Sequence, residues 1–166
     1  MAENNVDVAV LMGSDSDLPI VNEDLNIFDD FGVKYSISVL SAHSTPHQVI
    51  ELIKKSESNG CKLFIAAAGM AAHLAGAVAA HSLKPVIGIP IESGGLGGLD
   101  SLLSTAQMPP GIPVATVAVG KAGAKNSAIL AIQMLAISDQ ALAEKMRNYR
   151  QNMTNEVLEK NKKLNS

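Results

Sequence analysis

The sequence has few cysteine and aromatic residues and no evident membrane-targeting segment. It contains one cysteine and no tryptophan, and its only aromatic side chains are two tyrosines and three phenylalanines. A single cysteine, Cys61, excludes an intramolecular disulfide and suits a reducing compartment. The N-terminal stretch lacks a basic region with a cleavage site, and its apolar run is far shorter than the roughly 20 residues that span a bilayer. We therefore expect a cytoplasmic protein that does not use a membrane.

Charge is also scarce. Charged residues make up 17% of 166 residues, and the net charge is −3, whereas soluble proteins carry roughly 25% charged residues. The only basic block is the short tail KNKK, so the sequence argues against nucleic-acid binding, which uses a basic stripe. Low charge leaves little surface that must face water, and this favours a surface partly covered by other subunits.

Five short apolar runs recur along the chain, with stretches between them that are long enough for helices. The runs are almost continuously apolar, which is typical of parallel strands buried on both faces. Their alternation with helices predicts an α/β doubly wound domain with a five-stranded parallel sheet and right-handed crossovers. The expected strands lie within 6–13, 33–40, 62–69, 85–91 and 112–120, and the expected helices are 17–31, 46–59, 71–83 and 97–107.

Two further helices are expected after the last strand. Residues 122–137 are apolar nearly all round, which predicts a buried helix. Residues 139–162 are polar, with one apolar stripe spaced for a helix face: Leu142, Met146, Tyr149, Met153 and Val157. This helix either packs on its own domain or reaches a neighbouring subunit, and the low charge favours the neighbour. We thus expect a single domain over 1–166, with an α/β core over 6–137.

In open α/β sheets, ligands bind at the carboxyl ends of the strands. Four expected strands end in loops that carry polar or small residues, and the topology predicts that these loops meet at one edge. They read GSDSD (13–17), SAHSTP (41–46), AAGMAAHLAG (67–76) and PIESGGLGGLD (90–100).

The first loop admits two interpretations. The Ser14 and Ser16 hydroxyls and the N–H groups of a helix N-terminus suit a phosphate. Alternatively, Ser16 or Asp17 simply caps the helix, with Pro19 in its first turn. The Asp17 carboxylate opposes an anion but can accept hydrogen bonds from ribose hydroxyls. The loop is neither a Walker motif nor a G-x-G-x-x-G fingerprint, so it does not indicate ATP or a dinucleotide.

Two histidines lie in the next two loops. His43 sits in SAHSTP, before a predicted cap at Thr45 and a proline at the first helical turn. It is either a structural residue or a group that moves a proton near neutral pH. His73 is expected in the first turn of the helix after Gly69, whose missing side chain lets a ligand approach or a helix pack closely.

The remaining polar features are less informative. His47 and His81 fall within predicted helices and are expected at the surface. The histidine and acidic spacings match no metal site, so none is expected. The glycines of 94–98 suit either a lid or a flexible loop.

Taken together, several segments resemble one family. MGSDSD, SAH-TP, AAHL-G and GLDSLLS--QMP-G-PVATVAVGKAGAKN are similar to the N5-carboxyaminoimidazole ribonucleotide mutases, the small-subunit type of phosphoribosylaminoimidazole carboxylase. The likeness extends from about residue 6 to 160. It implies a flavodoxin-like three-layer domain in an octamer, active sites at subunit contacts and a C-terminal helix on a neighbour. It also implies no metal and no organic cofactor.

The resemblance implies a role in purine (IMP) biosynthesis, beside a carbamate-forming synthetase. The reaction moves a carboxylate from the exocyclic nitrogen of aminoimidazole ribonucleotide to ring carbon C4, through trapped CO2. By resemblance His43 is the acid and base that moves the protons. The implied substrate-binding residues are Ser14, Ser16, Asp17, Ser41, Ala42, Ser44, Gly69, Ala71, Ala72, His73 and Leu74.

Three positions depart from the family pattern. Ser44 replaces an arginine that is expected to grip the 5′-phosphate, Met70 replaces a small residue, and Ala75 replaces a proline. Either another basic group compensates for the arginine, or binding is weaker, or the ligand lacks the phosphate. Two alternatives to the mutase follow: a carboxylase that uses free CO2 directly, and a repurposed nucleotide-binding paralogue.

Overall fold

The computed structural model describes residues 5–165 of the chain. The chain forms two compact units, Met1–Ala131 and Ile132–Ser166, and one helix runs through the boundary between them. The first unit holds the whole sheet and the four loops that the sequence singles out.

The first unit is built on a five-stranded sheet in the order β2-β1-β3-β4-β5, in which every neighbouring pair is parallel. The three inner strands of the sheet are buried along nearly their whole length, which agrees with their continuous apolar sequences. This confirms the predicted fold class. The strands are β1 (Val8–Met12), β2 (Tyr35–Val39), β3 (Leu63–Gly69), β4 (Val86–Ile91) and β5 (Ala115–Thr116).

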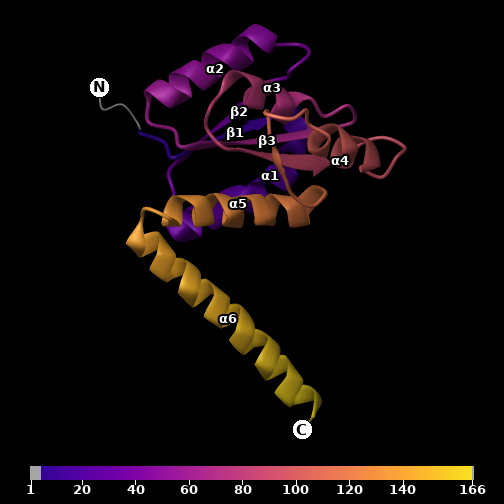
Figure 1. The fold of residues 1–166 in the computed structure, drawn as a ribbon. Coiled ribbons are helices and arrows are strands. Elements are labelled where there is room, and N and C mark those ends of the chain that lie inside the picture. Colours follow the sequence, from indigo (N-terminus) through magenta and orange to yellow (C-terminus); the bar gives the residue numbers. More distant parts are fainter. Residues whose placement is uncertain (1–4, 166) are drawn as a thin grey trace. The chain divides into compact units, whose positions relative to one another are not determined.

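Helices cover both faces of this sheet. Figure 1 shows α2 and α3 over one face and α1 with α5 over the other. Each strand is followed along the chain by a helix or helical turn, so each loop at the carboxyl end of a strand leads to the N-terminus of a helix. The elements are η1 (Asp15–Asp17), α1 (Leu18–Phe31), α2 (Pro46–Ser58), α3 (Leu74–His81), α4 (Leu99–Ala106) and α5 (Gly120–Ala136).

The two faces of the sheet are packed differently. Under α2 and α3 the core is apolar, with Leu11, Ile53 and Phe64 among its members. Between α1 and α5 the core contains a carboxyl group, because Asp24 is fully buried. The Ser127 hydroxyl oxygen lies 2.5 Å from the Asp24 Oδ1 and 2.7 Å from the Ala124 carbonyl oxygen, so this hydroxyl can donate its proton to either acceptor.

The buried Asp24 has a strongly altered pKa. Burial raises the pKa of this carboxyl from 3.8 to about 8, against the lowering effects of hydrogen bonds from Ser127 and the Ala128 amide. Its second oxygen, Oδ2, has no hydrogen-bond partner within 5–165. Because an unpaired charge is costly in the core, the neutral acid is the form that this site favours.

Several expected boundaries were wrong. Only Ala115 and Thr116 pair as β5, because Pro113 has no N–H for the ladder and the helix begins at Gly120, not at 122. Residues 71–73 form a turn, so α3 begins at Leu74 and His73 occupies its N-cap position.

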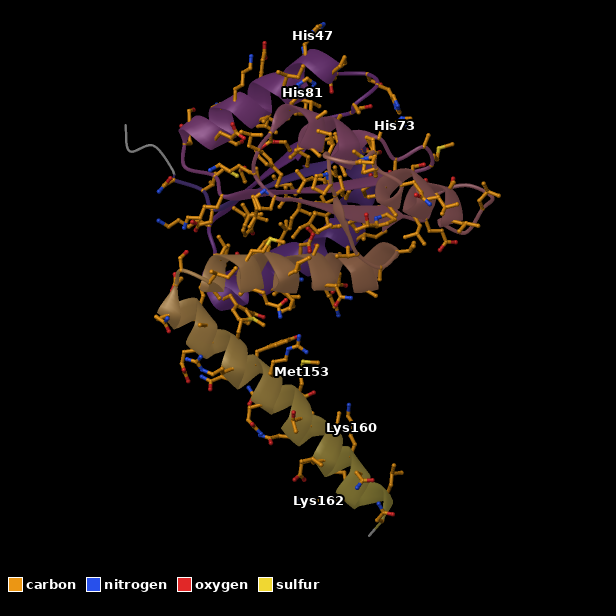
Figure 2. The ribbon with its side chains drawn as sticks, viewed as in Figure 1. His47, His73, His81, Met153, Lys160 and Lys162 are labelled. Carbon is orange, nitrogen blue, oxygen red and sulfur yellow. The ribbon has the colours of Figure 1, made fainter. Side chains whose placement is uncertain are left out.

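The prediction that the helix after β5 is buried all round was also wrong for the single chain. Ala124, Ser127 and Ala131 are buried on one face of α5, whereas Lys125 and Gln133 are exposed. The prediction for two histidines was correct: His47 on α2 and His81 at the end of α3 are exposed, and Figure 2 labels both.

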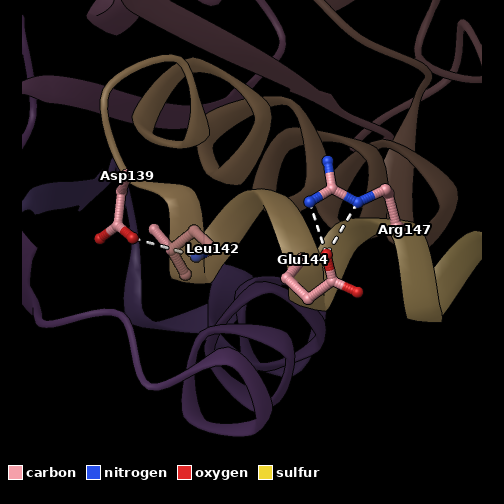
Figure 3. A network of polar contacts seen from close by, with 4 residues as sticks. All are labelled: Asp139, Leu142, Glu144 and Arg147. Carbon is pink, nitrogen blue, oxygen red and sulfur yellow. Dashed lines mark hydrogen bonds and ion pairs between the residues drawn. The ribbon is translucent and has the colours of Figure 1, made fainter.

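The second unit contains α6 (Gln140–Leu164). Its N-cap is Asp139, whose carboxylate accepts a hydrogen bond of 3.0 Å from the Leu142 amide, and one turn later Glu144 pairs with Arg147 (Figure 3). Along the predicted stripe Met146 is buried, but Met153 and Val157 are 45% and 64% exposed. In the described part of the chain, no helix is apolar and long enough to cross a membrane.

Candidate active site

A cavity of about 290 Å³ lies at the carboxyl ends of the strands. It receives residues from the loops after β1, β2, β3 and β4, as the topology predicts. Its lining comprises Gly13, Ser14, Ser16, Asp17, Ser41, Ala42, His43, Ala68, Gly69, Met70, Ala71, His73, Leu74 and Ser93.

The loop after β1 is held by a reciprocal cap. The Ser14 hydroxyl accepts a hydrogen bond of 3.2 Å from the Ser16 amide, and the Asp17 carboxylate accepts one of 3.2 Å from the Ser14 amide. Asp17, one of the two predicted candidates, is the N-cap residue of α1, but its side chain makes no cap bond to that helix; the side-chain cap comes from Ser14 at the start of η1. Pro19 does lie in the first turn of α1, as predicted.

Asp17 is largely buried at the base of this loop. Burial raises the pKa of its carboxyl, and the charge of Asp15 adds to the rise, whereas hydrogen bonds from Ser14 and Ser16 lower it. A carboxyl group in this position accepts hydrogen bonds well and repels an anion. It therefore suits a sugar hydroxyl better than a phosphate.

The loop after β2 is organised around Ser41. Its hydroxyl accepts hydrogen bonds of 3.2 Å from the amides of His43 and Ser44. Its own amide donates to the Thr45 hydroxyl oxygen at 2.9 Å, and that hydroxyl donates back to the Ser41 carbonyl oxygen at 3.0 Å. Thr45 is the N-cap residue of α2, with Pro46 following, as predicted. These bonds fix the backbone that carries His43.

His43 and His73 meet across the cavity. The Nε2 of His43 lies 2.7 Å from the Nδ1 of His73, and the rings are perpendicular, with centroids 4.9 Å apart. At this separation one nitrogen carries a proton and the other accepts it. Both side chains are exposed, and Figure 2 labels His73 at the start of α3. The sequence nominated both residues, but nothing in it predicted that they touch.

The loop after β3 brings backbone close to the cavity. Met70 adopts a left-handed conformation, with φ of 54°, and its side chain is 62% exposed. This conformation costs a residue other than glycine about 1–2 kcal/mol. The sequence identified Met70 as a departure from the family pattern, and the structure places it at the rim of the cavity.

Two nominated residues do not line the cavity. Ala72 is buried, and Ser44 is exposed beside the cavity, with only its backbone amide in the local hydrogen bonds. Four lining residues were not among the predicted site residues: Gly13, Ala68, Met70 and Ser93. Of these four, Ser93 has the only hydroxyl; its signal was its position two residues after the predicted strand 85–91, in a loop that was interpreted as either a lid or a flexible loop.

No lysine or arginine is among the described residues that line the cavity. Lys121 and Lys125 instead pair with Glu23 on α1, at 3.6 Å and 3.4 Å. Within 5–165, no group of three or more histidine, cysteine or acidic side chains is arranged to hold a metal ion.

The fold and the cavity define a class: a doubly wound α/β protein with a hydrogen-bonded histidine pair at the edge of the sheet where ligands bind in such folds. Residues 7–156 match the family model described as AIR carboxylase. The chain belongs to this family of enzymes.

Relatives and a solved structure agree with this assignment. N5-carboxyaminoimidazole ribonucleotide mutase of Pyrococcus horikoshii is 51% identical over 95% of this chain and 88% of its own length. The Escherichia coli K12 protein of the same name is 46% identical over 94% and 92%. A crystal structure of Treponema denticola PurE superposes with a TM-score of 0.87 at 30% identity, and covers 95% of this chain and 97% of that one.

Proposed function

We propose that the chain converts N5-carboxyaminoimidazole ribonucleotide to 4-carboxy-5-aminoimidazole ribonucleotide in purine biosynthesis. The observation that carries this proposal is the His43–His73 contact of 2.7 Å, inside a cavity formed by the four loops at the strand ends. The names of relatives about half identical over nearly the whole chain support the same reaction.

His43 supplies the protons in this proposal. Its ring donates a proton to the carbamate nitrogen, and cleavage of the N–C bond releases CO2 and leaves the electron pair on nitrogen. The neutral aminoimidazole then uses its C4 carbon to attack CO2 and form the new C–C bond. The bare His43 nitrogen removes the C4 proton, which restores both the aromatic ring and the protonated histidine. His73 orients the His43 ring through their hydrogen bond.

The remaining site residues bind different parts of the substrate or hold the loop that carries His43. Asp17 accepts hydrogen bonds from the ribose hydroxyls, and Ser14 and Ser16 supply neutral donors beside it. Ala42 borders the flat imidazole ring, while Ser41 holds the His43 loop in place. The backbone around Gly69, Ala71, Ala72 and Leu74 cradles CO2 and the carboxylate.

Incubation with freshly prepared N5-carboxyaminoimidazole ribonucleotide tests the function. We expect the C4-carboxylated product to appear, and its ultraviolet absorbance measures its formation. The carboxylase alternative predicts instead efficient use of aminoimidazole ribonucleotide plus CO2 at low bicarbonate. The paralogue alternative predicts tight binding without turnover of either donor. Either of these results would contradict the mutase.

Ser44→Arg tests how the phosphate is held. The cavity lining has no cation among its described residues. A charge-assisted bond from the new guanidinium is therefore expected to tighten binding of the phosphorylated product about 10- to 150-fold. Calorimetry with the product and with its dephosphorylated nucleoside measures the change. Ser44→Gln has a long polar side chain without charge and is the matched control.

The gain from Ser44→Arg should be confined to the phosphorylated ligand and absent from Ser44→Gln. Unchanged affinity would mean that another group already holds the phosphate or that the phosphate lies elsewhere. In that case the missing arginine at position 44 would not weaken binding of the phosphorylated ligand.

We also propose that the protein assembles as an octamer in the cytoplasm, with α6 on a neighbouring subunit, and that it works beside a carbamate-forming synthetase. Exposed apolar side chains on α6, among them Val157 at 64% and Leu164 at 85%, support a covering partner. The cavity volume of about 290 Å³ lies just below the range of ligand pockets, about 300–1,000 Å³, and this favours completion of the site by another copy. Light scattering that gives a mass other than eight chains would contradict the octamer.

A further inference from the structure

Ser93 brings a hydroxyl to the cavity from a strand that the mechanism above does not use. It lies two residues beyond β4 and is half-buried. Among the described residues, none forms a hydrogen bond with its hydroxyl. A half-buried hydroxyl that lines a ligand cavity without a protein partner is available to the ligand.

Gly69 provides the space for this hydroxyl. Gly69 pairs with Ile91 at the ends of β3 and β4. A Cβ atom built on Gly69 would overlap the Ser93 hydroxyl oxygen, and would lie 3.0 Å from the Ser93 Cβ and 3.2 Å from the Ile91 carbonyl oxygen. Gly69 has no positive φ, so its backbone does not require glycine. Its missing side chain is needed for space, and Ser93 occupies that space.

The position of Ser93 in the cavity determines which part of the substrate its hydroxyl can contact. The strand order places the loops in the sequence β2, β1, β3, β4 along the edge. Asp17 follows β1, and His43 follows β2 and reaches His73 after β3. The proton that His43 moves and the transferred carboxyl group share carbon C4, so the carboxyl group must lie beside His43 and its partner His73. Ser93 and Gly69 border that part of the cavity on its β4 side.

We propose that Ser93 donates a hydrogen bond to the transferred carboxyl group and thereby distinguishes carboxylated from uncarboxylated ligands. This inference rests on the proposed function. A neutral hydroxyl is chemically suited to the task, because the group changes from anion to CO2 and back. A cation would favour the anionic forms strongly over CO2, whereas a hydroxyl favours them only moderately.

Binding of two ligands to Ser93→Ala tests the proposal without requiring turnover. The ligands are 4-carboxy-5-aminoimidazole ribonucleotide and aminoimidazole ribonucleotide, which differ only in the carboxylate. We expect Ser93→Ala to weaken binding of the first about 10- to 100-fold and to leave binding of the second within about twofold. Ser104→Ala is the matched control, because Ser104 is also half-buried but bonds to the Asp100 carbonyl oxygen outside the cavity.

Gly69→Ala provides a second variant. Its new methyl group displaces the Ser93 hydroxyl, so it should cause the same loss of selectivity, and should add little in the Ser93→Ala background. Equal losses for both ligands, or none for either, would overturn the proposal. If Ser93→Ala weakens binding of the carboxylated ligand alone but the wild-type protein shows no turnover, the proposed function fails and the role of Ser93 stands. If it binds neither ligand, both are wrong.

Discussion

Replacing His43 by asparagine is expected to lower the rate of carboxyl transfer by about 10²–10⁴-fold, the usual contribution of a general acid–base group. Asparagine occupies similar space but cannot gain and lose a proton. The side chain is exposed and forms a 2.7 Å hydrogen bond with His73, so the substitution removes no core packing. Turnover is measured by product absorbance, with circular dichroism and light scattering to verify folding and assembly.

The chain offers a close control for this experiment. His47 is also an exposed histidine, four residues further on, and lies on α2 outside the cavity. His47→Asn should turn over at the wild-type rate. His73→Asn should lower the rate less than His43→Asn and shift its pH profile, because it removes the partner that orients the ring. A rate within tenfold of wild type for His43→Asn would remove the proton-transfer role.

The strand positions could be predicted because burial on both faces leaves a continuous apolar signal. Residues 62–69 are such a run, and β3 occupies nearly all of it. The same reasoning failed for residues 112–120, because an apolar run does not reveal how many residues form ladder bonds. Pro113 and the early start of α5 at Gly120 leave only two.

The site was predictable at the level of loops but not of contacts. Topology alone places His43 and His73 at one edge, since parallel strands end together. That their nitrogens lie 2.7 Å apart depends on how the turn before α3 is built, which spacing does not encode. Ser93 was missed for a related reason: its hydroxyl matters because Gly69, 24 positions earlier, leaves space for it.

The buried acid could not be predicted either. Asp24 lies within α1, where a polar residue normally marks the solvent face. Its partner Ser127 is far along the chain on α5, in a stretch that appears almost wholly apolar. Only the packing of these two helices brings the groups together. The result is a titrating group in the core, with consequences for stability that the sequence does not suggest.

Asp24→Asn is expected to stabilise the protein increasingly as pH rises. The pKa of Asp24 is raised from 3.8 to about 8 in the folded protein. Between these values the unfolded chain has lost the proton and the folded protein keeps it, so folding stability falls with pH by about 1.4 kcal/mol per unit and levels off above about 8. Asparagine can still donate to the Ser127 hydroxyl oxygen but does not titrate.

The advantage of Asp24→Asn over wild type should therefore grow by on the order of 3–4 kcal/mol between about pH 5 and about pH 8. Urea unfolding at fixed protein concentration measures it at each pH. Asp30→Asn is the control, because Asp30 is an exposed acid on the same helix, and it should show no such growth. A pH-independent difference for Asp24→Asn would mean that the buried carboxyl is ionised in the folded protein, with a compensating partner.

The variant Ser127→Ala distinguishes an ionised Asp24 from a neutral one. If Asp24 is ionised, removal of the Ser127 donor destabilises the protein more at high pH than at low pH. If Asp24 is neutral, the loss is nearly the same at both values until the pH approaches 8.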